Sequence, residues 1–395
     1  MNYQLDFPII ENLKSSNRPY VYLDNAATSL KPISVIEAVS NYYTHCGANV
    51  HRGSYKAGEY ATILYEQARN TIAEFINAKN NEIIFSKGTT DSLNLLADLL
   101  ELKKEDVIIN CLHDHHANFI VWKERACLHT VEMTPDGLIN LQMLEDILKT
   151  NKVKLITIPY ATNITGNIQP VMDIMGLAKK YNTLVCIDGA QIVSHRAVDI
   201  KTISADFFAF SSHKMFGPTG VGVLYIQENI LEKMPYKRFG GGMINTYTLQ
   251  QKNYKKPPIG FEPGTPAIEA VIGFGKAVEY ILNIGFEAFN THSSAWSVLF
   301  LKHLESSAWK LAFPKSDDSL PIFTLNHKNR TMDLAYLGRL LSDAYNIAVN
   351  DGQQCCGPLY ASAGLAAGLR VSAHIYNSLT EPEYFFHCLD ELSFY

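Results

Sequence analysis

The chain has 395 residues, of which 47% are hydrophobic and 18% are charged. This composition is typical of a globular protein, and the length favours two domains over one. The formal net charge of −5 argues against a nucleic-acid binder, which would carry a basic face. No apolar run approaches the roughly 18 residues that a membrane-spanning helix needs, so we expect no membrane partner either.

The ends and cysteines of the chain indicate its compartment. Residues 1–13 have neither the basic nor the apolar region of a secretory signal. The seven cysteines show no regular spacing, which suits a reducing environment better than a disulfide framework. We therefore expect a cytoplasmic protein.

The N-terminal part of the chain leads into a candidate phosphate-binding turn. Residues 1–18 lack periodicity and are expected to form an arm or a short helix. Two helical patterns follow, and then an apolar strand runs through Gly88, Thr89 and Thr90 into an amphipathic helix. A helix N-terminus with two hydroxyls and a glycine is suited to holding a phosphate group. A simple threonine cap of the helix is the alternative.

A strand predicted over 106–112 ends in a group of three histidines, His113, His115 and His116. Residues 119–128 are then predicted to be helical. The histidines raise the possibility of a zinc site, but they lack the helical His-x-x-x-His spacing with a nearby carboxylate. We therefore expect no metal.

Two later strands end in a carboxylate and a lysine. One runs into Asp188-Gly189-Ala190-Gln191, and the next runs into Ser211-Ser212-His213-Lys214. Ligands of open α/β sheets bind at the strand ends. A partly desolvated lysine there can form a Schiff base, and a carboxylate can keep a pyridine nitrogen protonated. Either residue alone is equally compatible with a turn or a cap, but the pair predicts pyridoxal phosphate (PLP) as cofactor.

The order of elements predicts an α/β protein of two parts. Strands alternate with helices from Ile83 to Ile226, which is typical of a doubly wound, mainly parallel sheet. Beyond about residue 290 the sequence pattern predicts a mixture of shorter strands and helices. We expect a large domain over 19–285 and a small C-terminal α+β domain over 286–395, with the arm 1–18 packing on the small domain.

Cys355 and Cys356 lie side by side in a loop rich in glycine and alanine that ends near Arg370. From the residues alone, the two thiols could be a redox pair, a metal site or a coincidence. A metal site is the weakest of these, since no other cysteine or histidine is close in sequence.

The ordered motifs resemble the class V aminotransferase superfamily of fold-type I PLP enzymes. Within it, they are most similar to the cysteine desulfurase and selenocysteine lyase branch with a short catalytic loop. The motifs that carry the resemblance are Tyr22-Leu23-Asp24-Asn25-Ala26-Ala27, Asp188 to Gln191, and Ser211 to Gly220. The resemblance extends to about Asn377, and it implies a seven-stranded, mainly parallel sheet flanked by helices, PLP as cofactor, and a homodimer.

The same resemblance implies an activity: conversion of L-cysteine to L-alanine, with the sulfur left as a persulfide on Cys355. Lys214 is implied as the Schiff-base lysine that moves protons, and His115 as a catalytic ring stacked on the cofactor. The other implied cofactor contacts are Thr89, Thr90, Asn163, Asp188, Gln191, Ser211, His213 and, from a second subunit, Thr265. The implied substrate contacts are Arg370, Asn163 and Ala27.

Three features depart from the family pattern. Asn350 stands where an arginine is usual, Gln353 and Gln354 replace two histidines, and Cys356 follows the nucleophile. They leave open whether cysteine or a related amino acid is the substrate. The alternatives are a selenocysteine lyase, an aminotransferase, an epimerase, or a weakly active PLP-binding relative.

The expected reaction also needs a recipient for the sulfur. The resemblance implies a sulfur-acceptor protein, serving iron–sulfur cluster or thio-cofactor assembly. We expect Cys356 to face away from the cofactor, towards solvent or the small domain, because neighbouring side chains on an extended loop point in opposite directions.

Overall fold

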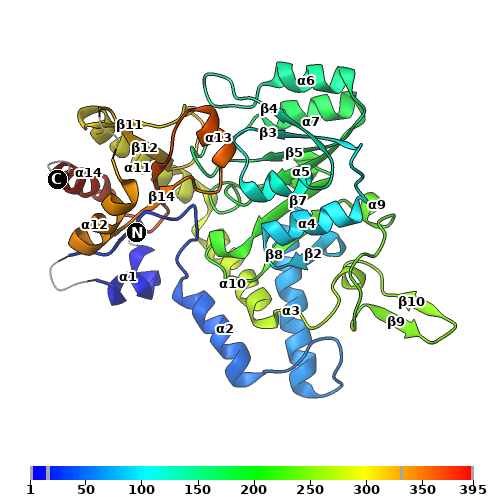
Figure 1. The fold of residues 1–395 in the computed structure, drawn as a ribbon. Coiled ribbons are helices and arrows are strands. Elements are labelled where there is room, and N and C mark those ends of the chain that lie inside the picture. The colour runs from blue at the N-terminus through cyan, green and yellow to red at the C-terminus, as the bar shows by residue number, and fades with distance from the viewer. Residues whose placement is uncertain (1–2, 15–17, 330–331, 393–395) are drawn as a thin grey trace.

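The computed structural model describes residues 3–14, 18–329 and 332–392, and its largest element is a seven-stranded sheet (Figure 1). The strand order is β2-β8-β7-β6-β5-β3-β4. Only β8 runs antiparallel to its neighbours, which confirms the predicted α/β class with a mainly parallel sheet. The strands are β2 (Ile83–Ser86), β3 (Val107–Cys111), β4 (Cys127–Val131), β5 (Val153–Pro159), β6 (Leu184–Asp188), β7 (Phe207–Ser211) and β8 (Gly222–Ile226).

The central strands are apolar on both faces because helices cover both faces. Along β7, Phe207 and Ala209 belong to one hydrophobic cluster, whereas Phe208 and Phe210 belong to another. This alternation is the two-residue period of a strand. The helices of this part are α2 (Ile33–His45), α3 (Lys56–Phe75), α4 (Thr89–Leu99), α5 (Ile120–Lys123), α6 (Leu141–Thr150), α7 (Val171–Lys180), α8 (Ile200–Ile203), α9 (Glu228–Leu231) and α10 (Ile268–Ile284).

A second, four-stranded antiparallel sheet lies beside the first, in the order β11-β12-β15-β14 (Figure 1). Its strands are β11 (Trp309–Leu311), β12 (Ile322–His327), β14 (Asn350–Gly352) and β15 (Gly368–Ser372). It has its own core, in which Trp296, Phe300 and Phe323 stack on one another. The helices of this part are α11 (Phe286–Ser306), α12 (Leu334–Tyr345), α13 (Gly357–Ser362) and α14 (Glu381–Leu392).

The N-terminal segment contacts both parts of the molecule, since its Phe7 packs on Phe216 and Tyr280 of the first part. It forms a 3₁₀ turn (Tyr3–Asp6), α1 (Pro8–Asn12) and β1 (Val21–Tyr22), which pairs in parallel with β13 (Ile347–Ala348). The division of the chain at 285/286 stays a prediction. Among the helices in the described ranges, none is both long and apolar enough to span a bilayer.

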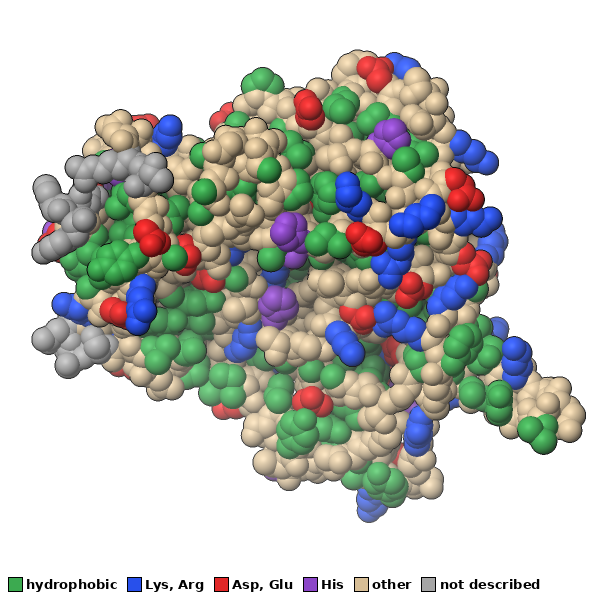
Figure 2. Space-filling view, in the orientation of Figure 1, with side chains coloured by type: hydrophobic (Ala, Val, Ile, Leu, Met, Phe, Trp, Pro, Cys, Tyr) green, Lys and Arg blue, Asp and Glu red, His purple; other side chains and the backbone are tan. Residues whose placement is uncertain are grey.

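Two elements differ from the sequence-based expectations. The helix predicted over 119–128 is wrong: α5 is one turn long, and the edge strand β4 follows it. An edge strand is only partly buried, so its sequence lacks the apolar run that identified the central strands. The hairpin of β9 (Ile244–Tyr247) and β10 (Lys252–Tyr254) was not predicted, and it projects from the surface with hydrophobic side chains exposed (Figures 1 and 2).

Candidate active site

A cavity of about 380 Å³ lies where the carboxyl ends of the central strands meet the second sheet. Both parts of the chain contribute to its wall. The sequence-predicted residues that line it are Ala27, Thr89, Thr90, His115, Asn163, Asp188, Gln191, Ser211, His213, Lys214, Cys355 and Arg370. Thr265 does not line it and is exposed elsewhere. The folded chain therefore brings together residues that are up to 343 positions apart (370 − 27).

Asp188 and Lys214 face this cavity because they end neighbouring parallel strands. Asp188 is the last residue of β6, and Lys214 ends the short 3₁₀ turn after β7. Burial lowers the pKa of Lys214, while the Asp188 carboxylate opposes that shift. Burial also raises the pKa of Asp188. The hydrogen bond from the Ala190 N–H (2.9 Å) and the charge of Lys214 lower it, but by less. The pair supplies a desolvated amine beside a buried carboxylate.

Hydroxyl groups gather at the start of α4, at the edge of the same cavity. The Thr89 N–H donates to Ser211 Oγ at 2.8 Å, and the hydroxyls of Thr89 and Ser211 are 2.7 Å apart. Gly88 caps the helix at φ 143°, in the region that favours glycine. A Cβ on Gly222 would lie 2.5 Å from Gly88 Cα, so β8 must pass this turn as bare backbone.

These features fit a PLP molecule. A buried carboxylate stands where a pyridinium nitrogen needs a partner, and a helix N-terminus with hydroxyls stands where a phosphate needs donors. Lys214 lines the wall of the same cavity as both groups.

The three histidines predicted from the sequence do not converge. His115 Nδ1 accepts a hydrogen bond from the Ala117 N–H at 3.0 Å, and burial with the nearby Lys214 charge lowers the pKa of His115 to about 3. His116 Nε2 accepts instead from the Gly357 N–H at 3.0 Å. His113 is buried away from the cavity lining. In the described part of the chain, no group of three His, Cys, Asp or Glu side chains is arranged to hold a metal ion.

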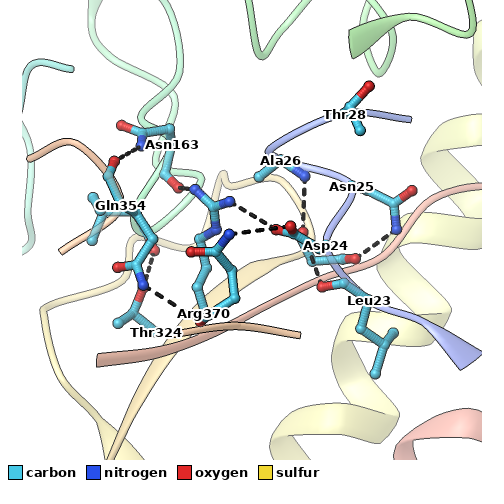
Figure 3. A network of polar contacts seen from close by, with 12 residues as sticks. Leu23, Asp24, Asn25, Ala26, Thr28, Asn163, Thr324, Gln354 and Arg370 are labelled. Carbon is cyan, nitrogen blue, oxygen red and sulfur yellow. Dashed lines mark hydrogen bonds and ion pairs between the residues drawn. The ribbon is translucent and has the colours of Figure 1, made fainter. Parts of the chain in front are cut away.

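Arg370 is held by an acidic partner that the sequence analysis missed (Figure 3). Its Nη2 donates to Asp24 Oδ1 at 2.9 Å, and its Nη1 donates to the Asn163 carbonyl at 3.1 Å. Asn350 Nδ2 donates to the other oxygen of Asp24 at 3.1 Å. Asp24 stands inside the motif that carried the family resemblance, but nothing near it in sequence reveals its charge partner. Only the folding of β15 onto the β1 loop pairs them.

The loop before Arg370 presents Cys355 to the cavity. Gln354 and Cys355 adopt left-handed φ angles of 42° and 57°, so the extended loop assumed from the sequence is wrong. Two hydrogen bonds hold this turn: the His116 N–H donates to the Cys355 carbonyl (2.7 Å), and Asn163 Nδ2 donates to the Gln354 carbonyl (2.8 Å). The amide of Asn163, expected to contact substrate, therefore also fastens the loop.

Cys356 does not line the cavity, and of the two surroundings expected for it only solvent is wrong. It is fully buried rather than solvent-facing, and its Sγ lies 3.4 Å from the Asp114 carbonyl. It packs with Ile164, Leu359 and Tyr360 in a small apolar cluster. Burial raises the pKa of its thiol, so Cys356 is held as a neutral core side chain.

The family model and the similar proteins of known sequence indicate the same family. The aminotransferase class-V family model matches residues 21–385. The chain is 36% identical to a probable cysteine desulfurase of Streptomyces coelicolor, with 95% of this chain and 93% of the relative covered. It is 34% identical to a cysteine desulfurase of Salmonella agona, with 95% and 94% covered.

Solved structures agree with these relatives. The apo structure of the cysteine desulfurase from Thermococcus onnurineus NA1 superposes with a TM-score of 0.91 at 32% identity, covering 98% of this chain and 96% of that one. The cysteine desulfurase CsdA of Escherichia coli gives a TM-score of 0.87 at 28% identity, covering 98% and 97%.

Proposed function

Because the chain belongs to the class-V aminotransferase family, we propose that it is a PLP-dependent cysteine desulfurase. It converts L-cysteine to L-alanine and takes the sulfur onto Cys355. The observation that carries this proposal is that Cys355 lines the same cavity as Lys214, Asp188 and Arg370. Amino transfer needs no enzyme thiol, whereas removal of sulfur that leaves alanine needs a nucleophile to accept the sulfur.

Each residue around the cavity has a task that suits its chemistry. Bound PLP supplies an electron sink for the substrate α-carbon. Asp188, which lines the cavity, would accept the hydrogen bond of the pyridine N–H, and the hydroxyls of Thr89 and Ser211 would donate to the phosphate. Arg370, whose guanidinium suits a carboxylate, holds the α-carboxylate of the substrate.

The two reacting side chains then divide the chemistry. The Lys214 amine removes the proton from the substrate α-carbon, since burial favours its neutral form. The Cys355 thiolate attacks the substrate sulfur, the carbon–sulfur bond breaks, and a persulfide forms on Cys355. Lys214 or His115 returns a proton to the carbon that lost the sulfur, which yields alanine.

We also infer that the active form is a homodimer. Thr265 is exposed and away from the cavity of its own chain, which supports a contact with the cofactor phosphate of a second subunit. Cys355 is exposed, which supports transfer of its persulfide sulfur to an acceptor protein for iron–sulfur cluster or thio-cofactor assembly.

The test is a product measurement on PLP-loaded protein with L-cysteine and a thiol reductant. We expect alanine and sulfide in equal amounts, and no turnover by a Lys214→Ala variant. Alanine formation without sulfide, or amino transfer that depends on an added keto acid, would contradict a desulfurase.

A further inference from the structure

The cavity wall offers a cationic partner to one carboxylate of a substrate but not to a second one. We propose that this site selects amino acids with an uncharged side chain and rejects those with an anionic side chain, and that Asn350 is the residue that sets this selectivity. The inference rests on the proposed function only in that an α-amino acid binds with its carboxylate at Arg370.

Two basic side chains remain once the neutral histidines of the cavity wall are set aside. Burial lowers the pKa of His115 to about 3 and that of His213 to about 4, so both rings are neutral near pH 7. Among the described residues that line the cavity, this leaves Arg370 and Lys214, and burial favours the neutral form of Lys214. Lys214 is committed to the cofactor, so Arg370 is the cation available to a substrate.

A further lysine lies close to the site but points elsewhere. Lys31 does not line the cavity. Its ammonium donates to the Thr28 hydroxyl at 3.1 Å, to the His213 carbonyl at 3.0 Å and to the Ser29 carbonyl. It therefore offers no free donor to a substrate.

The charge of Arg370 is already balanced before a substrate arrives. Asp24 lies 2.9 Å from it and is itself mostly buried, with 19% of its side chain exposed (Figure 3). A substrate carboxylate can still bind the guanidinium, which donates from several N–H groups. A second anionic group would meet no unpaired cation and would be repelled by Asp24 at low local dielectric.

Asn350 lies beside Arg370, and it determines whether this part of the cavity wall carries a second cation. It pairs with Arg370 across β14 and β15, and it lines the cavity. Its amide donates to Asp24 Oδ2 at 3.1 Å, which satisfies that oxygen without adding a positive charge. With Gln354 and Cys355 beside it, the wall near the nucleophile is polar but carries no cation.

The decisive experiment compares L-asparagine with L-aspartate, which have the same size and differ in side-chain charge. Binding to the PLP-loaded protein is measured by calorimetry at pH 7.5. We expect asparagine to bind at least about 10-fold more tightly, the factor that corresponds to one missing charged hydrogen bond. Equal binding of the two ligands, or binding of neither, would overturn the proposal.

Variants at position 350 identify the residue responsible. Asn350→Arg should reduce or reverse the preference, whereas Asn350→Gln, which keeps a neutral amide, should retain it. Asp24→Asn provides a second route, because removing the repelling charge should also improve aspartate binding relative to asparagine. A preference that stays unchanged in both Asn350→Arg and Asp24→Asn would overturn the assignment. Turnover of L-cysteine in the same preparation tests the desulfurase function separately.

Discussion

At the scale of single residues, burial decides which groups of this site react. Cys355 and Cys356 have the same chemistry and are adjacent in sequence, yet one lines the cavity and the other is a core side chain. A thiol must ionise to act as a nucleophile, and burial disfavours the ionised form. The burial of Cys356 therefore supports the sequence-based choice of Cys355 as the residue that carries the persulfide.

The first prediction separates the two thiols. Cys355→Ala should lose sulfide production by about 100-fold or more, because the sulfur has no acceptor. Cys356→Ala should keep most of the activity and lose about 1 kcal/mol of unfolding free energy, as expected for a small core truncation. The measurements are sulfide release with L-cysteine, peptide mapping after alkylation, and urea unfolding. A persulfide found on Cys356, or equal losses of activity, would contradict the assignment.

At the scale of elements, a buried ion pair fixes the segment that leads to Thr265. Arg69 of α3 is 1% exposed, and its two terminal nitrogens donate to the two oxygens of Glu262 at 2.8 and 2.7 Å. Glu262 Oε1 also accepts from the Phe85 N–H at 2.7 Å. The pair thus joins a helix, the edge strand β2 and the segment before Thr265, and it raises the pKa of Arg69 further above its usual value.

The second prediction concerns this pair. Glu262→Gln should lower the free energy of unfolding by about 3 kcal/mol, because it leaves the buried guanidinium with only the partly exposed Glu66 as counter-charge. Urea unfolding of the PLP-free protein measures the effect. The matched control is Glu279→Gln, which breaks the exposed Lys276–Glu279 pair and should barely move the midpoint. Similar midpoints for the two variants would show that the buried pair is not a main support of this segment.

At the scale of the whole molecule, a cluster of buried histidines lies where the second sheet's side meets the first. His195 follows β6, and His374 follows β15; their rings stack with centroids 4.3 Å apart. Burial lowers the pKa of His195 to about 3 and places that of His374 well below its usual value. Burial also lowers the pKa of His292, which lies on α11. Neither His195 nor His374 belongs to the proposed chemistry.

The third prediction is a loss of stability in acid. The unfolded chain binds protons at histidines below pH 6.5, whereas these buried rings remain neutral, so their contribution to the free energy of unfolding falls as pH drops below 6.5. His195→Phe keeps an aromatic ring but removes one such group. The free energy of unfolding should therefore fall by about 1 kcal/mol less in this variant than in the parent when the pH is lowered from 6 to 5.

Asp114 and Glu381, whose pKa values burial raises to about 8 and about 7, act in the opposite direction. They are unchanged in the variant, so the difference isolates His195. An identical pH dependence for His195→Phe and the parent would contradict the prediction.

The sequence by itself determined that Asp188 and Lys214 lie at one cavity, and it determined the order of most elements. Asp188 and Lys214 each end an apolar strand, and parallel strands bring their carboxyl ends to one edge, so a local pattern was enough to predict that they meet. The same reasoning located the turn of Gly88 and Thr89, and the resemblance extended it to Cys355 and Arg370. It failed for β4 and for the hairpin of β9 and β10, where partial exposure removes the apolar pattern.

Only the tertiary structure decided the charges and the shape of the substrate end of the cavity. Asp24 and Arg370 are 346 residues apart, and no periodicity or motif states that one neutralises the other. The burial of Cys356 depends on Asp114 and on Ile164, which belong to the other part of the chain. A pKa or an ion pair depends on what surrounds a group in space, and for this site those surroundings come from three distant segments of the chain.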